Sequence, residues 1–177
     1  MARSSLSLYR ISQLDLALCL RLNRLSHFRF WRGLFRGISR LGNGVFWYAL
    51  MATLPLIYGA AAWPTVARMA LAGVLGLVIY KWLKLRTSRP RPFQVYAAIS
   101  AAAPTLDRFS FPSGHTLHAF SFALVAAAGF PELATVLFPF AVLIAASRPI
   151  LGLHYPSDVL AGALLGTAVA ETVLLLG

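Results

Sequence analysis

The stretch SFPSGHTLHAFSFALVAAAGFPE, residues 110–132, decides the fold of this chain. A Pro-Ser-Gly turn opens it and a Pro-Glu turn closes it, with an apolar run between them. The run, from about residue 114 to residue 130, is close to the roughly 20 residues that a helix needs to cross a bilayer. The pattern predicts a membrane-spanning helix with Ser113, Gly114 and His115 at its N-terminus.

Composition extends this prediction to the whole chain. Of its 177 residues, 59% are hydrophobic and 12% are charged, whereas a soluble domain has about 25% charged residues. The net charge is +11. Because there is no soluble domain to carry a nucleic-acid-binding surface, we expect anionic lipid headgroups and phosphate substrates as partners, and no nucleic acid. The single cysteine, Cys19, excludes an intrachain disulfide and a thiolate metal cluster.

Four more apolar segments have a suitable length. The five predicted spans are residues 45–62, 65–83, 114–130, 133–146 and 157–176. In residues 6–41, leucines recur at helical spacing but arginines interrupt every long apolar window, which is typical of amphipathic helices at the membrane interface. Gly162 and Gly166 form a small-xxx-small pattern that favours close packing within the bundle.

The predicted fold is therefore all-α: a polytopic transmembrane helical bundle of about five spans plus N-terminal interfacial amphipathic helices. We expect one membrane-embedded domain, residues 1–177, in which residues 1–44 form the interfacial segment and residues 45–177 the helical core. A Gly42-Asn43-Gly44 turn joins the two parts.

Three polar clusters stand at the ends of the predicted spans. They are Lys84 with Arg91-Pro92, residues 112–115, and Ser147-Arg148 followed by His154 and Asp158. Successive spans cross the bilayer in alternate directions, so the second span ends, the third begins, the fourth ends and the fifth begins on one side. We expect all three clusters to meet at that membrane face.

The first two clusters contain groups that bind phosphate. Arg91 has a planar fork that clasps two phosphate oxygens, and Lys84 supplies a point charge; the alternative is a pair of cations that only anchor the topology. Ser113 and Gly114 stand at a helix N-terminus, where free N–H groups favour an anion. His115 follows on the first turn, close enough to protonate a leaving oxygen. The alternative is a serine cap with an interfacial histidine.

The third cluster contains a possible nucleophile. Arg148 adds a further phosphate clasp at the end of a span. His154 and Asp158 are four residues apart, so the carboxylate can hold one imidazole nitrogen and leave the other free as a nucleophile. Alternatively, Asp158 only caps the last helix.

The combination resembles the type 2 phosphatidic acid phosphatase family, whose signature is Lys-x6-Arg-Pro, Pro-Ser-Gly-His and Ser-Arg-x5-His-x3-Asp. All three elements occur in order between Lys84 and Asp158. The resemblance implies that His154 attacks phosphorus to form a phospho-histidine, that Asp158 orients it, and that His115 protonates the leaving group. It also implies that a set of donors stabilises the phosphate oxygens without metal or cofactor: Lys84, Arg91, Ser113, Gly114 and Arg148.

Other polar residues near these motifs have weaker assignments. Arg89, His118 and Asp107 are candidates for supporting the site from behind or for contacting a headgroup. The alternatives are an interfacial cation for Arg89 and a packed residue for His118, and Asp107 is expected to orient a loop arginine.

The predicted function is an integral-membrane, metal-independent lipid phosphatase. The candidate substrates are undecaprenyl diphosphate, phosphatidic acid, phosphatidylglycerol phosphate or a lipid A phosphate. The alternatives are a lipid phosphotransferase with the same site, or a non-catalytic anion transporter or headgroup-binding protein. We expect a multi-pass protein of the inner (cell) membrane; the positive-inside count favours a cytoplasmic site, and a periplasmic one remains open. The sequence leaves the oligomeric state undetermined.

Overall fold

The computed structural model describes residues 2–176, with side chains from residue 12 onward, and every regular element in this part of the chain is helical. The helices are α1 (Ala2–Asn23), α2 (Arg29–Leu41), α3 (Val45–Tyr58), α4 (Trp63–Thr87), α5 (Pro92–Val95), α6 (Gly114–Gly129), α7 (Ala134–Ile150) and α8 (Pro156–Leu175). Short 3-10 helices occupy Arg24–His27, Gly59–Ala62 and Pro131–Leu133. The all-α prediction is confirmed.

Three segments of the described residues are long and apolar enough to cross a membrane. They are Val45–Val95, which includes α3 and α4, then Pro131–Ile150 and Pro156–Leu175. Helix α6, with 16 residues, is shorter than these segments. The result supports a membrane protein, and the number of five spans stays a prediction.

Two helices extend further toward the polar clusters than the sequence predicts. Helix α4 continues to Thr87 because it ends only at Ser88, which adopts a left-handed conformation (φ 46°) and whose N–H donates to the Lys84 carbonyl. Helix α7 continues through Pro149 to Ile150. Lys84 and Arg148 therefore stand on the last turns of rigid helices rather than in flexible loops.

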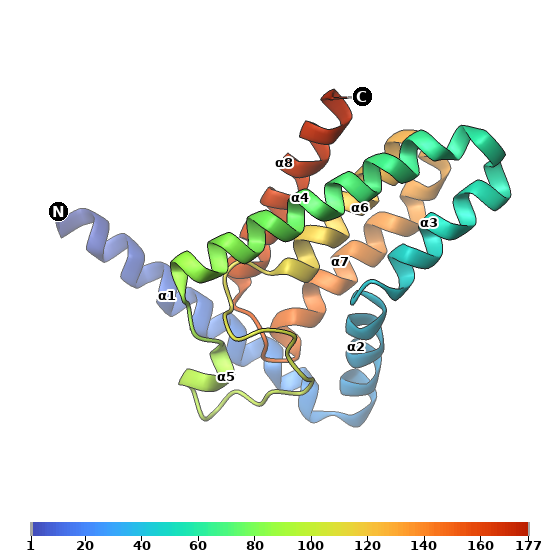
Figure 1. Ribbon diagram of the computed structural model, residues 1–177. Helices are drawn as coiled ribbons and strands as arrows, with labels where there is room; N and C mark the ends of the chain where they lie inside the picture. The colour runs from blue at the N-terminus through green and yellow to red at the C-terminus, as the bar shows by residue number, and fades with distance from the viewer. Residues whose placement is uncertain (1, 177) are drawn as a thin grey trace.

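Helix α6 is the centre of the bundle and packs mainly against α8, α4 and α7 (Figure 1). The closest approach is to α8 at Gly162 and Gly166. A Cβ added at Gly166 would lie 2.3 Å from the Leu117 carbonyl oxygen, and one at Gly162 would lie 2.6 Å from the Ser113 carbonyl oxygen. The two glycines thus let the backbones of α8 and α6 touch, as the small-xxx-small pattern predicts.

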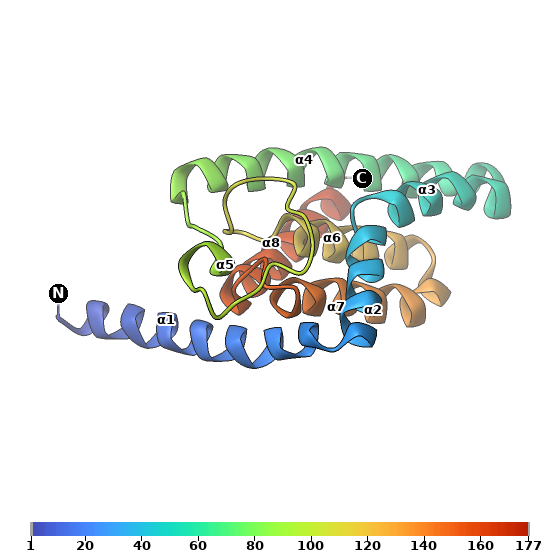
Figure 2. The same ribbon diagram turned by 90° about the horizontal axis from the view of Figure 1, so that it is seen from below.

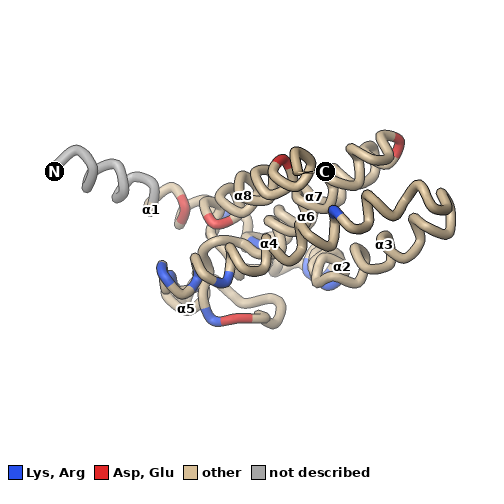
Figure 3. Tube along the Cα trace, turned by 45° about the horizontal axis from the view of Figure 1, so that its top comes forward, with Lys and Arg blue, Asp and Glu red and all other residues tan. Residues whose placement is uncertain are grey.

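The N-terminal helices α1 and α2 pack against other helices of the bundle, α1 against α7 and α8, and α2 against α7. Helices α1 and α4 lie on opposite sides of the bundle, with α6, α7 and α8 between them (Figure 2). Asn23, at the end of α1, is buried and donates from Nδ2 to the carbonyl oxygens of Ser100 (3.1 Å) and Ile150 (3.0 Å). Lys and Arg residues gather at α2 and at the α4–α5 end of the bundle (Figure 3).

Candidate active site

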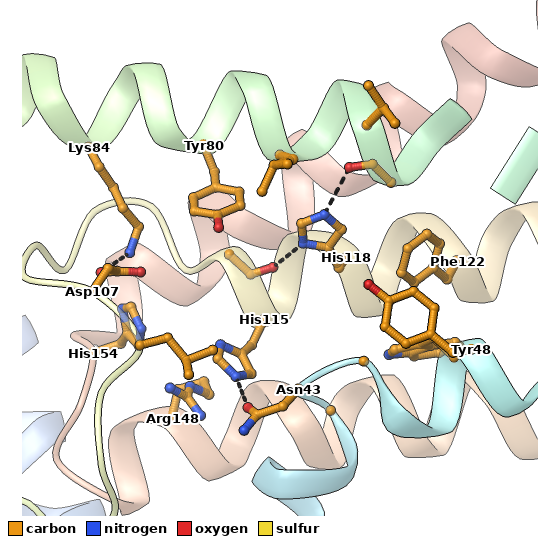
Figure 4. A pocket seen from close by; sticks show the side chains of 18 of the residues that line it. Asn43, Tyr48, Tyr80, Lys84, Asp107, His115, His118, Phe122, Arg148 and His154 are labelled. Atoms are coloured by element: carbon orange, nitrogen blue, oxygen red, sulfur yellow. Dashed lines mark hydrogen bonds and ion pairs between the residues drawn. The ribbon is translucent and has the colours of Figure 1, made fainter. Parts of the chain in front are cut away.

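A cavity of about 380 Å³ lies where α4 ends and α6 begins, and all three polar clusters contribute to its wall (Figure 4). The structure thus brings together the clusters that span counting places at one face. The polar lining residues are Asn43, Lys84, Arg91, Asp107, His115, His118, Arg148 and His154. The remainder of the wall is mainly apolar and comes from α3, α4 and α6, so the cavity has a charged region and an apolar region.

Arg148 is a buried cation in this wall without a carboxylate partner. Its side chain is 2% exposed, Nη1 donates to the Ser39 hydroxyl, and Nε has no hydrogen-bond partner within the described part of the chain. Among the described residues it forms no salt bridge. Burying a charge without a counter-ion is costly, and a guanidinium fork matches the oxygens of a phosphate. The arrangement is therefore suited to an anionic ligand.

Lys84 and Arg91 share one carboxylate, that of Asp107. The Asp107 Oδ1 atom lies 2.7 Å from Lys84 Nζ and 2.8 Å from Arg91 Nη2. Burial raises the pKa of Asp107, but hydrogen bonds and charge from Lys84, and then from Arg91, outweigh it and hold that pKa below its ordinary value. Asp107 therefore stays ionised and occupies the two cations that the sequence assigns to phosphate.

His154 is held as a neutral imidazole. Its Nδ1 atom lies 2.7 Å from the Ser110 carbonyl oxygen, which can only accept, and Nε2 lies 3.2 Å from Arg91 Nη1, which can only donate. This pair of bonds fixes the tautomer with the lone pair on Nε2. Burial, followed by the charges of Arg148 and Arg91, lowers the pKa of His154 well below its ordinary value. The lone pair of Nε2 thus accepts from Arg91, and it can act as a nucleophile only when that hydrogen bond is released.

Asp158 does not make the direct hydrogen bond to His154 that the sequence suggests. Its Oδ2 atom is 3.7 Å from His154 Nδ1, beyond hydrogen-bond distance, and the Ser110 carbonyl takes that place. The carboxylate is occupied instead by the Tyr155 N–H (2.8 Å) and by Arg89 Nη1 (2.7 Å). A residue in the first turn of a helix is close to the free N–H groups at the start of that helix, so the Asp158 carboxylate caps the N-terminus of α8.

Arg89 does not line the cavity but contacts Asp158 behind it, which agrees with a role behind the site; its contact with a headgroup stays a prediction. Its guanidinium lies between Asp158 and Asp15 of α1 (2.8 Å), stacked 4.1 Å from the Tyr155 ring. Asp15 also accepts from the Ser157 N–H at 2.9 Å. Sequence reasoning missed Asp15, although it is the only acidic residue before Asp107. The available signal for Asp15 was that it is a lone carboxylate in a helix whose other charged residues are basic.

The first turn of α6 presents the remaining predicted residues. Gly114 and His115 line the cavity, and His115 Nε2 contacts Asn43 Oδ1. The Ser113 hydroxyl is fully buried and accepts from the Thr116 N–H as a helix cap, so its phosphate contact stays a prediction. His118 lines the cavity and links α6 to α4, with Nδ1 2.9 Å from the Gly114 carbonyl oxygen and Nε2 3.2 Å from that of Gly73.

Comparison with known proteins identifies the family. The family model described as the PAP2 superfamily matches residues 61–176, well over half of the chain. The chain belongs to the PAP2 superfamily. Its sequence is 35% identical to the decaprenylphosphoryl-5-phosphoribose phosphatase of Mycobacterium tuberculosis over 144 residues, covering 78% of this chain and 76% of that protein.

Two solved PAP2-type structures share the fold. The crystal structure of LpxE of Aquifex aeolicus superposes with a TM-score of 0.74 at 28% identity, over 91% of this chain and 94% of that one. The transmembrane PAP2-type phosphatidylglycerolphosphate phosphatase of Bacillus subtilis superposes with a TM-score of 0.76 at 24% identity, over 94% and 86%. The predicted family and the predicted enzyme class, a metal-independent phosphatase of the membrane lipid type, are confirmed.

Proposed function

We propose that this PAP2 protein removes the terminal phosphate of a membrane lipid at the cavity described above. The observation that carries the proposal is Arg148, a buried cation in the cavity wall with an unsatisfied donor and no carboxylate partner. A phosphate dianion supplies the missing charge, and it competes with Asp107 for Lys84 and Arg91.

In the proposed reaction, His154 Nε2 attacks phosphorus and the bond between phosphorus and the lipid oxygen breaks. His115 donates a proton to the departing oxygen. A water molecule then attacks the phospho-histidine, its proton passes to His115, and the P–N bond breaks to release inorganic phosphate. Lys84, Arg91 and Arg148 stabilise the charge on the oxygens of phosphorus throughout.

The shape of the cavity supports a lipid as the carrier of that phosphate. Beside the charged groups, Ala70, Val74 and Leu77 of α4 and the Tyr48 ring of α3 form an apolar wall. A volume of about 380 Å³ suits a phosphate with the first groups attached to it, so the remaining chain lies in the bilayer. The similarity to a phosphatase of a decaprenyl-linked substrate supports a polyprenyl-linked phosphate as the first substrate class to examine.

The test is phosphate release by purified protein from a panel containing a polyprenyl-linked phosphoribose phosphate, undecaprenyl diphosphate, phosphatidic acid and phosphatidylglycerol phosphate. We expect turnover with EDTA present, and no turnover by His154→Ala, which should still bind lipid. Unchanged turnover by His154→Ala, or a requirement for a divalent cation, contradicts the proposal. Lipid binding without turnover of any substrate by the wild type favours a headgroup-binding protein.

We further propose that the site lies at the cytoplasmic face of a bacterial-type inner membrane. Positive charges gather at the α2 and α4–α5 end of the bundle (Figure 3), and positive charges favour the cytoplasmic side of a membrane protein. Thr105 is exposed beside the cavity and Ala61 is exposed at the turn between α3 and α4. In a Cys19→Ala background, a membrane-impermeant thiol reagent applied to intact cells should label Ala61→Cys and spare Thr105→Cys. The opposite pattern puts the site on the outer face.

A further inference from the structure

The turn between α2 and α3 does more than reverse the chain, because it forms part of the cavity wall. Gly42, Asn43 and Gly44 all line the cavity. Gly44 has φ 115°, and a Cβ there would lie 2.7 Å from the Tyr48 ring, while a Cβ at Gly42 would lie 3.1 Å from Ile144. Both flanking positions therefore favour glycine, and Asn43 is the single side chain that the turn presents to the cavity.

Asn43 contacts a histidine 72 residues further along the chain: its Oδ1 atom is the hydrogen-bond partner of His115 Nε2. An amide oxygen only accepts hydrogen bonds, so this contact requires a proton on Nε2. In Figure 4 the His115 ring lies between Asn43 on one side and His154 and Arg148 on the other. The ring is thus held from the side that faces away from the nucleophile.

We propose that Asn43 is a positioning residue for His115, and that it keeps the proton on Nε2 so that Nδ1 exchanges protons with the substrate. The proposal rests on the proposed function, in which His115 is the general acid. The first step starts from the imidazolium form of His115, in which both ring nitrogens carry a proton, and the Nδ1–H proton passes to the lipid oxygen as its bond to phosphorus breaks. In the second step Nδ1 takes a proton from the water that attacks phosphorus as the P–N bond to His154 breaks. The Nε2–H bond to Asn43 persists in both steps.

The first test compares two leaving groups in Asn43→Ala. For dioctanoyl phosphatidic acid, whose alkoxide must be protonated to leave, we expect kcat/KM to fall about 10- to 100-fold, since general acid catalysis contributes about 10²–10⁴-fold. For p-nitrophenyl phosphate, whose leaving group needs no proton, we expect a change of less than about threefold. Val45→Ala, at the neighbouring exposed position, is the matched control and should leave both rates unchanged.

The second test uses the pH profile and a double-mutant cycle. Asn43→Asp keeps an acceptor and adds negative charge, so the alkaline limb of kcat/KM for the lipid should move up by about one pH unit; Asn43→Ala should move it down. Adding Asn43→Ala to His115→Ala should cost nothing further, because the two residues act through one group.

An equal loss on both substrates, an unmoved alkaline limb, or additive losses in the double variant each overturn the positioning role and indicate a purely structural turn. These outcomes are separate from a failure of the proposed function, in which the wild-type protein itself releases no phosphate from either substrate or His154→Ala remains active.

Discussion

Replacing Arg148 by methionine should make the ligand-free protein more stable and the enzyme much less active. Arg148 is 2% exposed and, among the residues that the structure describes, its Nε has no partner and its side chain donates to the Ser39 hydroxyl alone. The side chain therefore bears the desolvation cost of a charge that Asp107, with which it forms no ion pair, offsets only in part, so that a bound anion would offset more of it. Methionine has a similar length and fills irregular apolar space without that cost.

The substitution is expected to increase the stability of the protein and to decrease the activity of the enzyme. Replacing buried charged groups by apolar ones of similar volume stabilises proteins by up to about 1–4 kcal/mol, and 1 kcal/mol corresponds to about 2–4 °C in Tm for a chain of this size. The loss of a fixed donor that stabilises developing charge costs about 10²–10³ in rate, or about 2.7–4 kcal/mol. We therefore expect Arg148→Met to raise Tm and to lower kcat/KM by at least 100-fold.

The assay is thermal unfolding in detergent, with and without inorganic phosphate, together with phosphate release from the best substrate of the panel. Phosphate at about 100 times its Kd should stabilise the wild type by about 2.7 kcal/mol and should leave Arg148→Met almost unchanged. Arg40→Met, at an exposed position of α2 outside the cavity, is the control and should alter neither property. A lower Tm for Arg148→Met with most of the activity retained would refute the reasoning.

Three further predictions follow from the contacts of the site. Asp107→Asn removes the carboxylate that pairs with Lys84 and Arg91, the cations proposed to bind phosphate. We expect the inhibition constant of inorganic phosphate to fall about tenfold, equivalent to about 1.4 kcal/mol, and an unchanged constant rules out competition between Asp107 and phosphate. The pKa of His154 is lowered in the folded protein. Below about pH 6.5 the unfolded chain therefore binds more protons than the folded protein does. The wild type should therefore lose stability relative to His154→Gln as the pH falls from 7 to 5, by at most about 1.4 kcal/mol per pH unit, and parallel Tm curves contradict this. Asp15→Ala breaks the contacts to Arg89 and Ser157 and should lower the free energy of unfolding by about 1–3 kcal/mol, against no change for Gln13→Ala on the exposed surface of α1; equal effects of the two substitutions show that α1 is not anchored there.

The local sequence pattern was sufficient to predict that the three polar clusters meet in one place. The turn signals around residues 112–115 and 131–132 set the limits of α6, and apolar runs on both sides set the direction of its neighbours. If each of the five predicted apolar helices crosses the bilayer, the order of the helices along the chain is enough to predict which ends meet. Lys84, Arg91, His115, Arg148 and His154 accordingly line one cavity.

The local sequence pattern did not predict the hydrogen-bond partner of His154, the proposed nucleophile. The spacing between His154 and Asp158 suggests a direct hydrogen bond, but Nδ1 bonds to the backbone carbonyl of Ser110, 44 residues away. Every residue has a carbonyl, so the sequence carries no signal for this choice. The direction of that carbonyl depends on how the loop before α6 packs against the α7–α8 connection.

The sequence by itself determined the helical class, the membrane setting, and which charged residues and histidines line the cavity, because apolar length and motif spacing are local properties of the chain. Only the tertiary structure decided what holds those groups in place. Asp15, Ser39 and Asn43 all come from the N-terminal segment, which the sequence treated as a membrane-surface anchor, and they contact Arg89, Arg148 and His115 respectively. These pairs are separated by 74, 109 and 72 residues. Such contacts arise only because α1, α2 and the turn after α2 pack against the other helices, since side chains that far apart meet through packing and not through any periodicity of the sequence.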